Sequence, residues 1–451
     1  MASFRMAVLR HRAPRLRPRT AGPRPQALLA VSLVVALAAC GTDRNAPAGL
    51  PRQPQLTTIA VPNLEHRGAG LAASGNEVVA TWTADNGHET NVFAAVSHDA
   101  GLTFGAPVRV NDIDGDARVS GEQAPRVAMG KDIVVAWQSR RGGKSAVRLA
   151  RSSDGGRSFA PAISIHADGL EGTRGWASLD VDDGGFAHLV WLDTRPERRP
   201  APRPAAPAAT GHVHGGTAMA TPQNIFHARI GQSGPPVESR IAPNVCFCCK
   251  TAVATSADGT IYAAWRHIYP PNYRDMAVAR STDGGTTFSP PVRLSEDGWA
   301  VDGCPEDGPS MAVDDQGVLH VAWPTIAPGR TDRKAIFYTY SSDGGRTFAP
   351  RLQIDEPSSA RKPAHPQLSL AGRTVVVTWD EDEGAARHVK VRKIHVDRTD
   401  PRTPPRPGTI ATIDIAATAG YPAIASTTSG TLVAWTATSP NSAVHVARLE
   451  E

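Results

Sequence analysis

Three of the five cysteines in this 451-residue chain fall within four positions, and thiols this close together can form disulfides, bind a metal or carry out redox chemistry. They are Cys246, Cys248 and Cys249, in the stretch NVCFCCKT. Thiolates bind zinc, and soft sulfur ligands select copper(I). Copper and zinc are therefore the candidate cofactors, and the elements that position these sulfurs decide between the three chemistries.

Seven short apolar runs that each end in a tryptophan organise the chain. The tryptophans are Trp82, Trp137, Trp191, Trp265, Trp323, Trp379 and Trp435, at intervals of 55, 54, 74, 58, 56 and 56 residues. Around each run lie further short segments separated by Gly/Asp turns, which gives four strands per unit. The pattern predicts an all-β, seven-bladed β-propeller of four-stranded blades over residues 55–451. The last unit lacks a fourth strand, which QLTTIAVP near residue 55 could supply to close the ring.

Four units carry the same turn, S-x-D-x-G-x-[ST]-F, between their third and fourth strands, at residues 97–104, 152–159, 281–288 and 341–348. The turn resembles the Asp-box of the sialidase (BNR repeat) superfamily. Its aspartates, Asp99, Asp154, Asp283 and Asp343, are expected to accept hydrogen bonds within the turn and to be structural. The sialidase fold has six blades, so a six-bladed propeller is the alternative to the seven units counted.

All four cysteines beyond residue 40 are predicted to reach one face of the propeller, where the loops before the first strands gather. Cys246, Cys248 and Cys249 precede the fourth unit, and Cys304 precedes the fifth. An exported protein with an even cysteine count favours disulfides: Cys304 with one of the cluster, and the other two in a small local ring. The alternative is a metal or redox site. An insertion at residues 192–222 would add His212, His214 and Met219 to it.

The resemblance to sialidases also implies candidates for glycoside hydrolysis. In that family an arginine holds the substrate carboxylate, an aspartate is the acid and a tyrosine is the nucleophile; Arg67, Asp85 and Tyr421 stand at the corresponding places. Arg67 lacks the family's R-I-P motif. Arg174 and Glu122 also lie at the predicted mouth, but neither is assigned to the remaining arginines or to the activating glutamate. A non-catalytic interpretation is favoured for each candidate. Arg67 would be a polar group facing the channel, Asp85 a solvated aspartate in a turn, and Tyr421 an aromatic side chain that fills the mouth.

Residues 1–39 have the pattern of a lipoprotein signal peptide. Seven arginines precede ALLAVSLVVALAAC, an apolar run too short to span a bilayer comfortably. Its end, Leu37-Ala38-Ala39-Cys40, resembles the bacterial lipobox, in which the cysteine receives a diacylglycerol. We expect lipidation at Cys40, a flexible tether over residues 40–54 and a location in the cell envelope, in the periplasm or at the outer membrane. An ordinary secretory signal is the alternative.

Without those seven arginines the formal net charge of +5 becomes −2, which gives no reason to expect nucleic-acid binding. The sequence therefore favours a monomeric, lipid-anchored, extracytoplasmic propeller that acts as a binding or assembly module for a carbohydrate or protein ligand. Metal or redox handling at the cysteine face is the suggested activity. A sialidase-like exo-glycoside hydrolase is the alternative.

Overall fold

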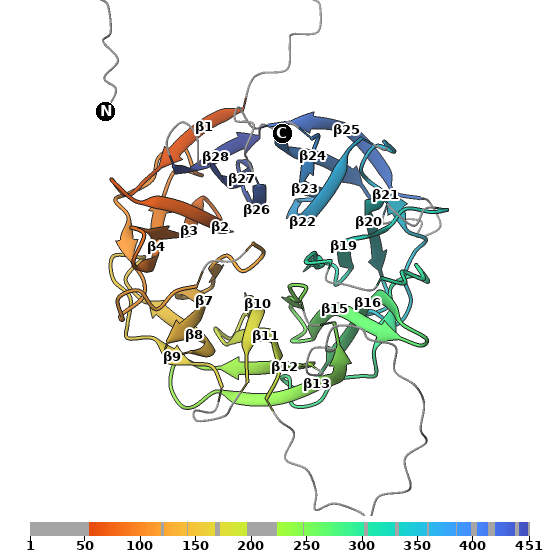
Figure 1. Cartoon of the computed structure of the whole chain (residues 1–451), viewed down its shortest axis with the longest axis horizontal. Helices are drawn as coiled ribbons and strands as arrows, with labels where there is room; N and C mark the ends of the chain where they lie inside the picture. The colour runs from red at the N-terminus through yellow and green to blue at the C-terminus, as the bar shows by residue number, and fades with distance from the viewer. Residues whose placement is uncertain are drawn as a thin grey trace, which may run out of the picture. The chain divides into compact units, whose positions relative to one another are not determined.

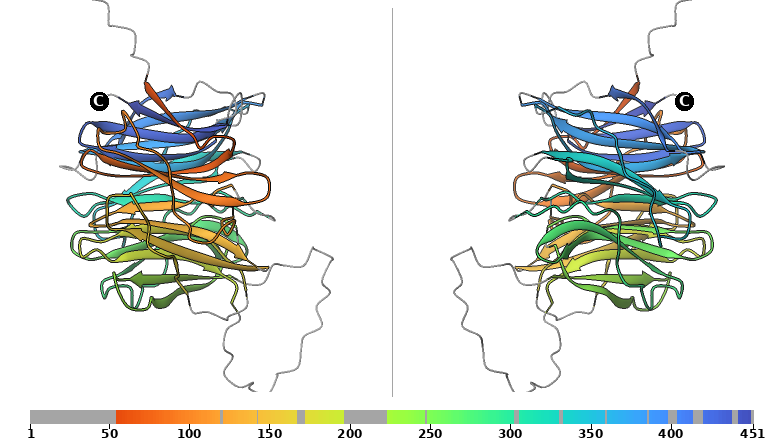
Figure 2. Two further views of the ribbon diagram at one scale, coloured as in Figure 1. Left: turned by 90° about the vertical axis from the view of Figure 1, so that its left-hand side faces the viewer. Right: turned by 90° about the vertical axis from the view of Figure 1, so that its right-hand side faces the viewer.

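Seven four-stranded antiparallel blades stand around a central axis (Figure 1), which confirms the seven-bladed β-propeller and excludes six blades. Blades three and four are joined into one eight-stranded sheet by the pairing of β13 with β15. The computed structural model describes residues 54–118, 121–141, 143–166, 172–195, 223–246, 248–301, 305–329, 333–358, 360–384, 386–397, 404–413, 420–437 and 442–449. This part of the chain contains no helix, so none of it forms a helical membrane span. Figure 2 shows the ring edge-on.

Each blade runs outward from its first strand, which lies nearest the axis. Blade one has β2 (Glu65–Ser74), β3 (Glu77–Asp85), β4 (Thr90–Ser97) and β5 (Val108–Arg109). Blade two has β6 (Arg126–Met129), β7 (Ile133–Arg141), β8 (Lys144–Ser152) and β9 (Ile163–Ser164). Blade three has β10 (Arg174–Val181), β11 (Ala187–Asp193), β12 (Gln223–Ile230) and β13 (Val237–Val245). Blade four has β14 (Ala252–Thr255), β15 (Ile261–Tyr269), β16 (Tyr273–Ser281) and β17 (Val292–Arg293).

The remaining blades repeat the pattern, and the last one closes the ring. Blade five has β18 (Ser310–Val313), β19 (Leu319–Ile326), β20 (Lys334–Ser341) and β21 (Leu352–Gln353). Blade six has β22 (Lys362–Ala371), β23 (Thr374–Asp382), β24 (Arg387–His395) and β25 (Arg406–Thr412). Blade seven has β26 (Gly420–Thr427), β27 (Gly430–Ala437), β28 (Ala443–Leu449) and, from the other end of the chain, β1 (Gln55–Ile59). β1 pairs with β28 from Gln55↔Arg448 to Ile59↔Val444, as the sequence predicted.

The repeated tryptophans form the core between blades. Each lies on the second strand of its blade and is at most 2% exposed. Trp82 packs with Leu432 and Val444 of the preceding blade, and Trp323 packs with Ala252 and Met276. Large buried aromatics dominate core energetics, so the spacing of these tryptophans sets the spacing of the blades.

The Asp-box aspartates are bound within their turns. In the turn after β20, Asp343 accepts hydrogen bonds from Ser341 Oγ (2.8 Å), Thr347 N (3.0 Å) and Thr347 Oγ1 (2.6 Å). Asp99, Asp154 and Asp283 make the same three contacts in their own turns. Although burial alone would raise the pKa of Asp343, these hydrogen bonds lower it to about 2. The hydrogen bonds that the carboxylate accepts therefore fix the conformation of the turn.

Asp343→Ala is expected to lower the free energy of unfolding by about 1–2 kcal/mol, because the hydrogen bonds from Ser341 and Thr347 are lost from a half-exposed turn. Urea denaturation at pH 7 followed by tryptophan fluorescence measures the change. Asp183→Ala, in the exposed turn between β10 and β11, is the matched control. Equal stability of the two variants would contradict the structural role of the Asp-box.

Two buried histidines meet between blades three and four. His188 Nδ1 lies 3.0 Å from His227 Nε2, and His188 Nε2 lies 3.0 Å from Asp182 Oδ2. Burial, followed by the charge of His188, lowers the pKa of His227 to about 3, and burial also lowers the pKa of His188. The folded protein therefore holds His227 uncharged at neutral pH.

This pair predicts loss of stability in mild acid. An unfolded histidine takes a proton near pH 6.5, whereas folded His227 does so only near pH 3. The unfolded state thus binds more protons between these values, and stability falls as the pH drops from about 6.5, by up to about 1.4 kcal/mol per pH unit. Thermal unfolding between pH 7.5 and 4.5 measures the slope. His227→Gln should flatten it, and an unchanged slope would show that other groups cause the acid sensitivity.

Candidate functional site

The seven inner strands begin around the axis, and side chains of other blades hold the backbone N–H groups at five of these beginnings. The pairs are Trp176 N with Gln123 Oε1 (3.0 Å), Lys250 N with Glu122 Oε2 (3.1 Å), Gly308 N with Glu122 Oε1 (3.0 Å), His365 N with Asp307 Oδ1 (2.9 Å) and Tyr421 N with Asp380 Oδ2 (2.7 Å). Donor and acceptor belong to different blades in every pair. The polar cluster at this end of the axis therefore ties the blades together.

Three of the held residues adopt a left-handed backbone conformation. Trp176, His365 and Tyr421 have φ of 52°, 56° and 52°, and each sits at a shift in the register of its inner strand. Such a conformation costs a residue with a side chain about 1–3 kcal/mol. The hydrogen bonds to their N–H groups offset this cost. The side chains of Trp176, His365 and the candidate Tyr421 are thus held by a strained and fixed backbone.

The charges of this cluster are buried and mutually compensated. Asp307 accepts from Lys334 Nζ at 2.9 Å, and His365 Nδ1 lies 2.9 Å from Asp380 Oδ2. Burial would raise the pKa of Asp307, but Lys334 and His365 outweigh it and the pKa is lowered. Burial raises the pKa of Glu122, against the opposing charge of Lys250.

The carboxylates of Glu122 and Asp307 and the imidazole of His365 lie within 4.8 Å of one another, which is close enough to share a metal ion. Both Glu122 oxygens already accept backbone N–H groups, and both Asp307 oxygens are also occupied. His365 is bonded through Nδ1 to Asp380. The arrangement is therefore that of a structural ionic network.

Tyr421 is half-buried beside this network, with its ring centroid 4.2 Å from that of His365. Burial raises the pKa of the Tyr421 hydroxyl, and the charge of Asp380 raises it further. The cavity lined by Gly121, Glu122, His365 and Tyr421 encloses only about 10 Å³. Pockets that bury small ligands enclose roughly 300–1,000 Å³, so this one does not accommodate a sugar ring.

The other two hydrolase candidates are engaged locally. Arg67, on β2, donates from Nη2 to Glu65 Oε2 at 2.7 Å on the surface. Asp85, at the end of β3, accepts from Gly87 N and from the hydroxyl of Thr90, and the bond from Thr90 lowers its pKa. A general acid needs a raised pKa, which neither contact provides. Arg174 is paired with Asp193 inside blade three.

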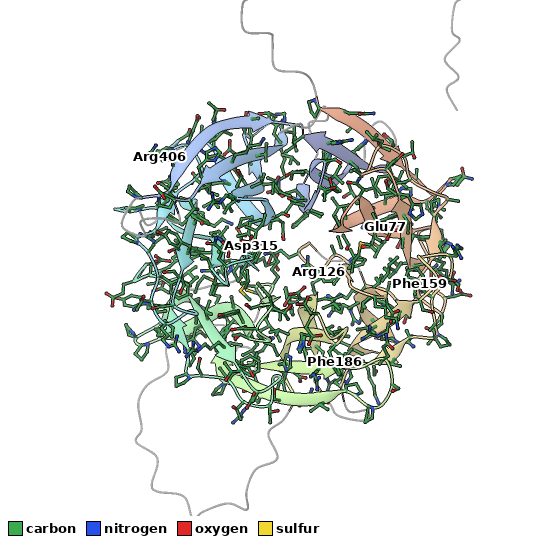
Figure 3. All side chains as sticks on the ribbon, turned by 180° about the vertical axis from the view of Figure 1, so that it is seen from behind. Glu77, Arg126, Phe159, Phe186, Asp315 and Arg406 are labelled. Carbon is green, nitrogen blue, oxygen red and sulfur yellow. The ribbon has the colours of Figure 1, made fainter. Side chains whose placement is uncertain are left out.

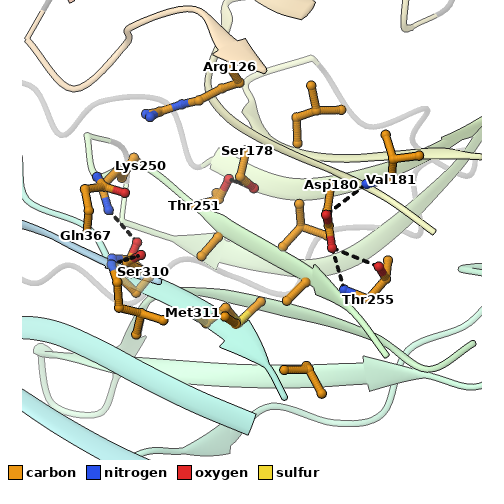
Figure 4. Close-up of a pocket in the computed structure, with 18 of the residues that line it drawn as sticks. Arg126, Ser178, Asp180, Val181, Lys250, Thr251, Thr255, Ser310, Met311 and Gln367 are labelled. Atoms are coloured by element: carbon orange, nitrogen blue, oxygen red, sulfur yellow. Dashed lines mark hydrogen bonds between the residues drawn. The ribbon is translucent and has the colours of Figure 1, made fainter. Parts of the chain in front are cut away.

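Beneath the polar cluster, a cavity of about 500 Å³ follows the axis between the inner strands (Figure 4). Arg126 and Lys250 line it at the end next to the cluster, and Asp180 and Asp183 line it toward the turn between β10 and β11. Lys250 Nζ donates to the carbonyls of Gly308, Pro309 and Pro366, and burial lowers its pKa to about 8. Figure 3 shows Arg126 close to the ring axis among the packed side chains.

The cysteine cluster is positioned by an extension of blade three onto blade four. β13 ends at Val245, which pairs with His267 of β15, and Cys246 N then donates to Arg266 O at 3.1 Å. Cys246, Cys248 and Cys249 are at most 3% exposed, and their sulfur atoms lie within 4.8 Å of one another. Trp176 and Ile268 pack against them. The structure thus brings together the three sulfurs that the sequence grouped.

Two of these cysteines form a hydrogen-bonded thiol pair next to two buried arginines. The bond from Cys249 and the charges of Arg266 and Arg274 lower the pKa of Cys246 to about 6 despite its burial. Burial, together with Cys246, raises the pKa of Cys249. Arg274 Nη1 donates to Cys246 Sγ at 3.3 Å, and the Nε atoms of Arg266 and Arg274 have no partner among the described residues. The pair therefore lies buried beside two cationic side chains, which favour the thiolate form of Cys246 over that of Cys249.

The expected local disulfide ring is not formed, because Cys246 and Cys249 are both free thiols. No disulfide joins two described cysteines; Cys248 is disulfide-bonded, with its partner beyond the described residues. Cys40, Cys304, His212, His214 and Met219 also lie outside the described residues, so their predicted roles stay predictions.

No protein-family model and no curated protein matches the chain. Among solved structures, a polysaccharide lyase, an ulvan lyase bound to -[GlcA(1-4)Rha3S]-, is 10% identical with a TM-score of 0.51 over 88% of this chain and 96% of that one. The chain shares its propeller fold. The phage phi92 endosialidase is 12% identical (TM-score 0.48, 88% of this chain and 69% of that one), and the Hadza microbial sialidase Hz136 is 15% identical (TM-score 0.47, 71% and 64%). Identities this low relate folds alone.

Sequence reasoning missed Arg266, Arg274 and Arg126. Each lies in a strand without a distinctive motif. The spacing of residues in the sequence therefore does not show that these side chains lie near the cysteines or the axis. One signal was available: Arg266 directly follows a core tryptophan on β15, on the side of the fourth blade where the cysteines arrive.

Proposed function

We propose that the protein is a lipid-anchored binding module of the cell envelope that holds a soft metal ion, copper(I), between Cys246 and Cys249. The observation that carries the proposal is the pair of free, hydrogen-bonded thiols against two buried arginines. The predicted signal peptide and Cys40 support the anchored location. A ring that is tied together at its axis supports a binding role, because it offers a rigid frame for one site.

Charge favours a monovalent ion. Two thiolates and one copper(I) ion carry a net charge of −1, which the unpartnered Nε–H groups of Arg266 and Arg274 would complement. Zinc sites in proteins use four ligands. Among the described residues only Cys246 and Cys249 offer free sulfur here, so zinc fits less well.

The test is a copper(I) titration of the exported protein under anaerobic conditions against a chromogenic copper(I) chelator. One tightly held ion per chain is expected, with no comparable retention of zinc. Failure to withdraw copper(I) from the chelator, with both thiols shown to be free, would refute the proposal.

A redox role is a second candidate, favoured by the opposite pKa shifts of two thiols three positions apart. The Cys246 thiolate would attack a low-molecular-weight disulfide and release one thiol, and Cys249 would then displace the second, leaving a Cys246–Cys249 disulfide. Equilibration with glutathione redox buffers, read by mass after thiol alkylation, tests this. Reversible oxidation without copper(I) binding would favour redox over metal handling.

A sialidase-like hydrolase has less support, because the cavity that Tyr421 lines among the described residues is too small for a sugar ring, and Asp85 has a lowered pKa. A carbohydrate or protein ligand for the rest of the surface remains part of the proposed binding role. Turnover of a fluorogenic sialoside that disappears in Tyr421→Phe would reverse this ranking.

A further inference from the structure

The guanidinium of Arg126 lines the axial cavity, and the described residues accept hydrogen bonds from only some of its donors. Arg126, on β6, donates from Nε to Ala177 O at 3.1 Å and from Nη2 to Glu122 O. Among the described residues, no acceptor meets its Nη1 and no carboxylate forms an ion pair with its guanidinium. A buried guanidinium with spare donors is costly unless an anion or water meets it. Arg126 therefore offers a binding group to whatever enters the cavity.

A second unused donor lies beside Arg126. The side-chain amide of Gln367, on β22, lines both the axial cavity and the small cavity above it, and it has no partner among the described residues. Figure 4 shows Arg126, Lys250 and Gln367 at one end of the cavity and Asp180 toward the other. Since Lys250 Nζ is bonded to three carbonyls, Arg126 and Gln367 are the donors at this end that have spare capacity among the described residues.

The rest of the cavity suits a small amphipathic molecule. Its volume of about 500 Å³ falls in the range of small-ligand pockets. Leu71, Met311 and Ile424 supply apolar side chains from three blades, and the hydroxyl groups of Ser178, Thr251 and Ser310 add polar surface. Asp180, toward the other end, already accepts Thr255 N and Oγ1, at 2.7 and 2.9 Å. An anionic head near Arg126 and an uncharged body along the axis match this distribution.

We propose that the axial cavity binds a small organic monocarboxylate, with its carboxylate on Arg126 and Gln367. Planar guanidinium and amide donors match the two oxygens of a carboxylate, whereas a dianionic phosphate would leave a charge unmatched. This site is independent of the cysteine cluster, so neither proposal rests on the other.

Benzoate is a suitable probe, because it combines one carboxylate with an apolar ring. Saturation-transfer NMR and calorimetry on the whole exported protein should detect benzoate binding, and benzyl alcohol, its neutral analogue, should bind at least about tenfold more weakly. Gln367→Leu should weaken benzoate binding, and Arg126→Met should abolish it. Arg126 bridges blades two and three, so circular dichroism must show that Arg126→Met is folded.

Met311→Trp provides the second variant, since it narrows the cavity without touching Arg126 and should also block the probe. Arg157→Met, at an exposed arginine in the second Asp-box turn, is the matched control and should leave benzoate affinity unchanged. The proposal fails if the wild-type protein binds benzoate no better than benzyl alcohol. It fails equally if Gln367→Leu and Met311→Trp, both folded, keep wild-type affinity.

Discussion

Replacing Cys246 by serine is expected to lower the affinity for copper(I) by at least about 100-fold. Changes to groups that merely support metal ligands cost about 10–100-fold in affinity, so removal of a ligand should cost no less. Serine keeps the size of the side chain and can still accept from Arg274, so the fold should persist. Cys249→Ser should have a similar effect, because one thiolate alone does not form a two-coordinate site.

The matched control is Cys248→Ser. Its sulfur lies in the same cluster but is disulfide-bonded, so this variant should lose stability and retain copper(I). Competition with the chromogenic chelator gives the affinities, and thermal unfolding gives the stabilities. If all three variants bind copper(I) as tightly as the wild type, the ion is held elsewhere. If Cys248→Ser alone loses binding, the third sulfur, and not the pair, is the ligand.

The fold could be predicted from the sequence because its determinants are local. Each blade carries its own core tryptophan, and four carry an Asp-box whose hydrogen bonds close within eight residues. The closure of the ring by β1 could also be predicted, because the seventh unit of the sequence has only three strands of its own. The grouping of three cysteines was equally plain.

The sequence could not predict which of the three cysteines stay free thiols, nor which side chains surround them. The difference in pKa between Cys246 and Cys249 arises from the hydrogen bond between the two thiols, from Arg266 and Arg274 beside Cys246, and from the burial of Cys249. The sequence analysis placed Glu122 at the mouth but did not predict its hydrogen bonds to two backbone N–H groups. The two N–H groups that it accepts, from Lys250 and Gly308, are 128 and 186 residues away and meet it only once the ring has closed.

Glu122→Ala is expected to lower the free energy of unfolding by about 3–5 kcal/mol, the range for removing one partner from a buried ionic network. The variant would leave the N–H groups of Lys250 and Gly308 unpaired, and the Lys250 ammonium would lose the attraction of the Glu122 charge. Because those two residues begin the inner strands of blades four and five, the damage reaches three blades. Urea denaturation at pH 7 measures the change.

Glu122→Gln separates charge from hydrogen bonding. The amide keeps the size of the side chain and one acceptor oxygen, but its NH₂ group faces a backbone N–H where the carboxylate accepted, so an intermediate loss is expected. Since Lys250 is held at its ammonium by three carbonyls, its charge would remain buried without Glu122 to balance it. If Glu122→Ala proved no less stable than the wild type, the network at the axis would not hold the blades together.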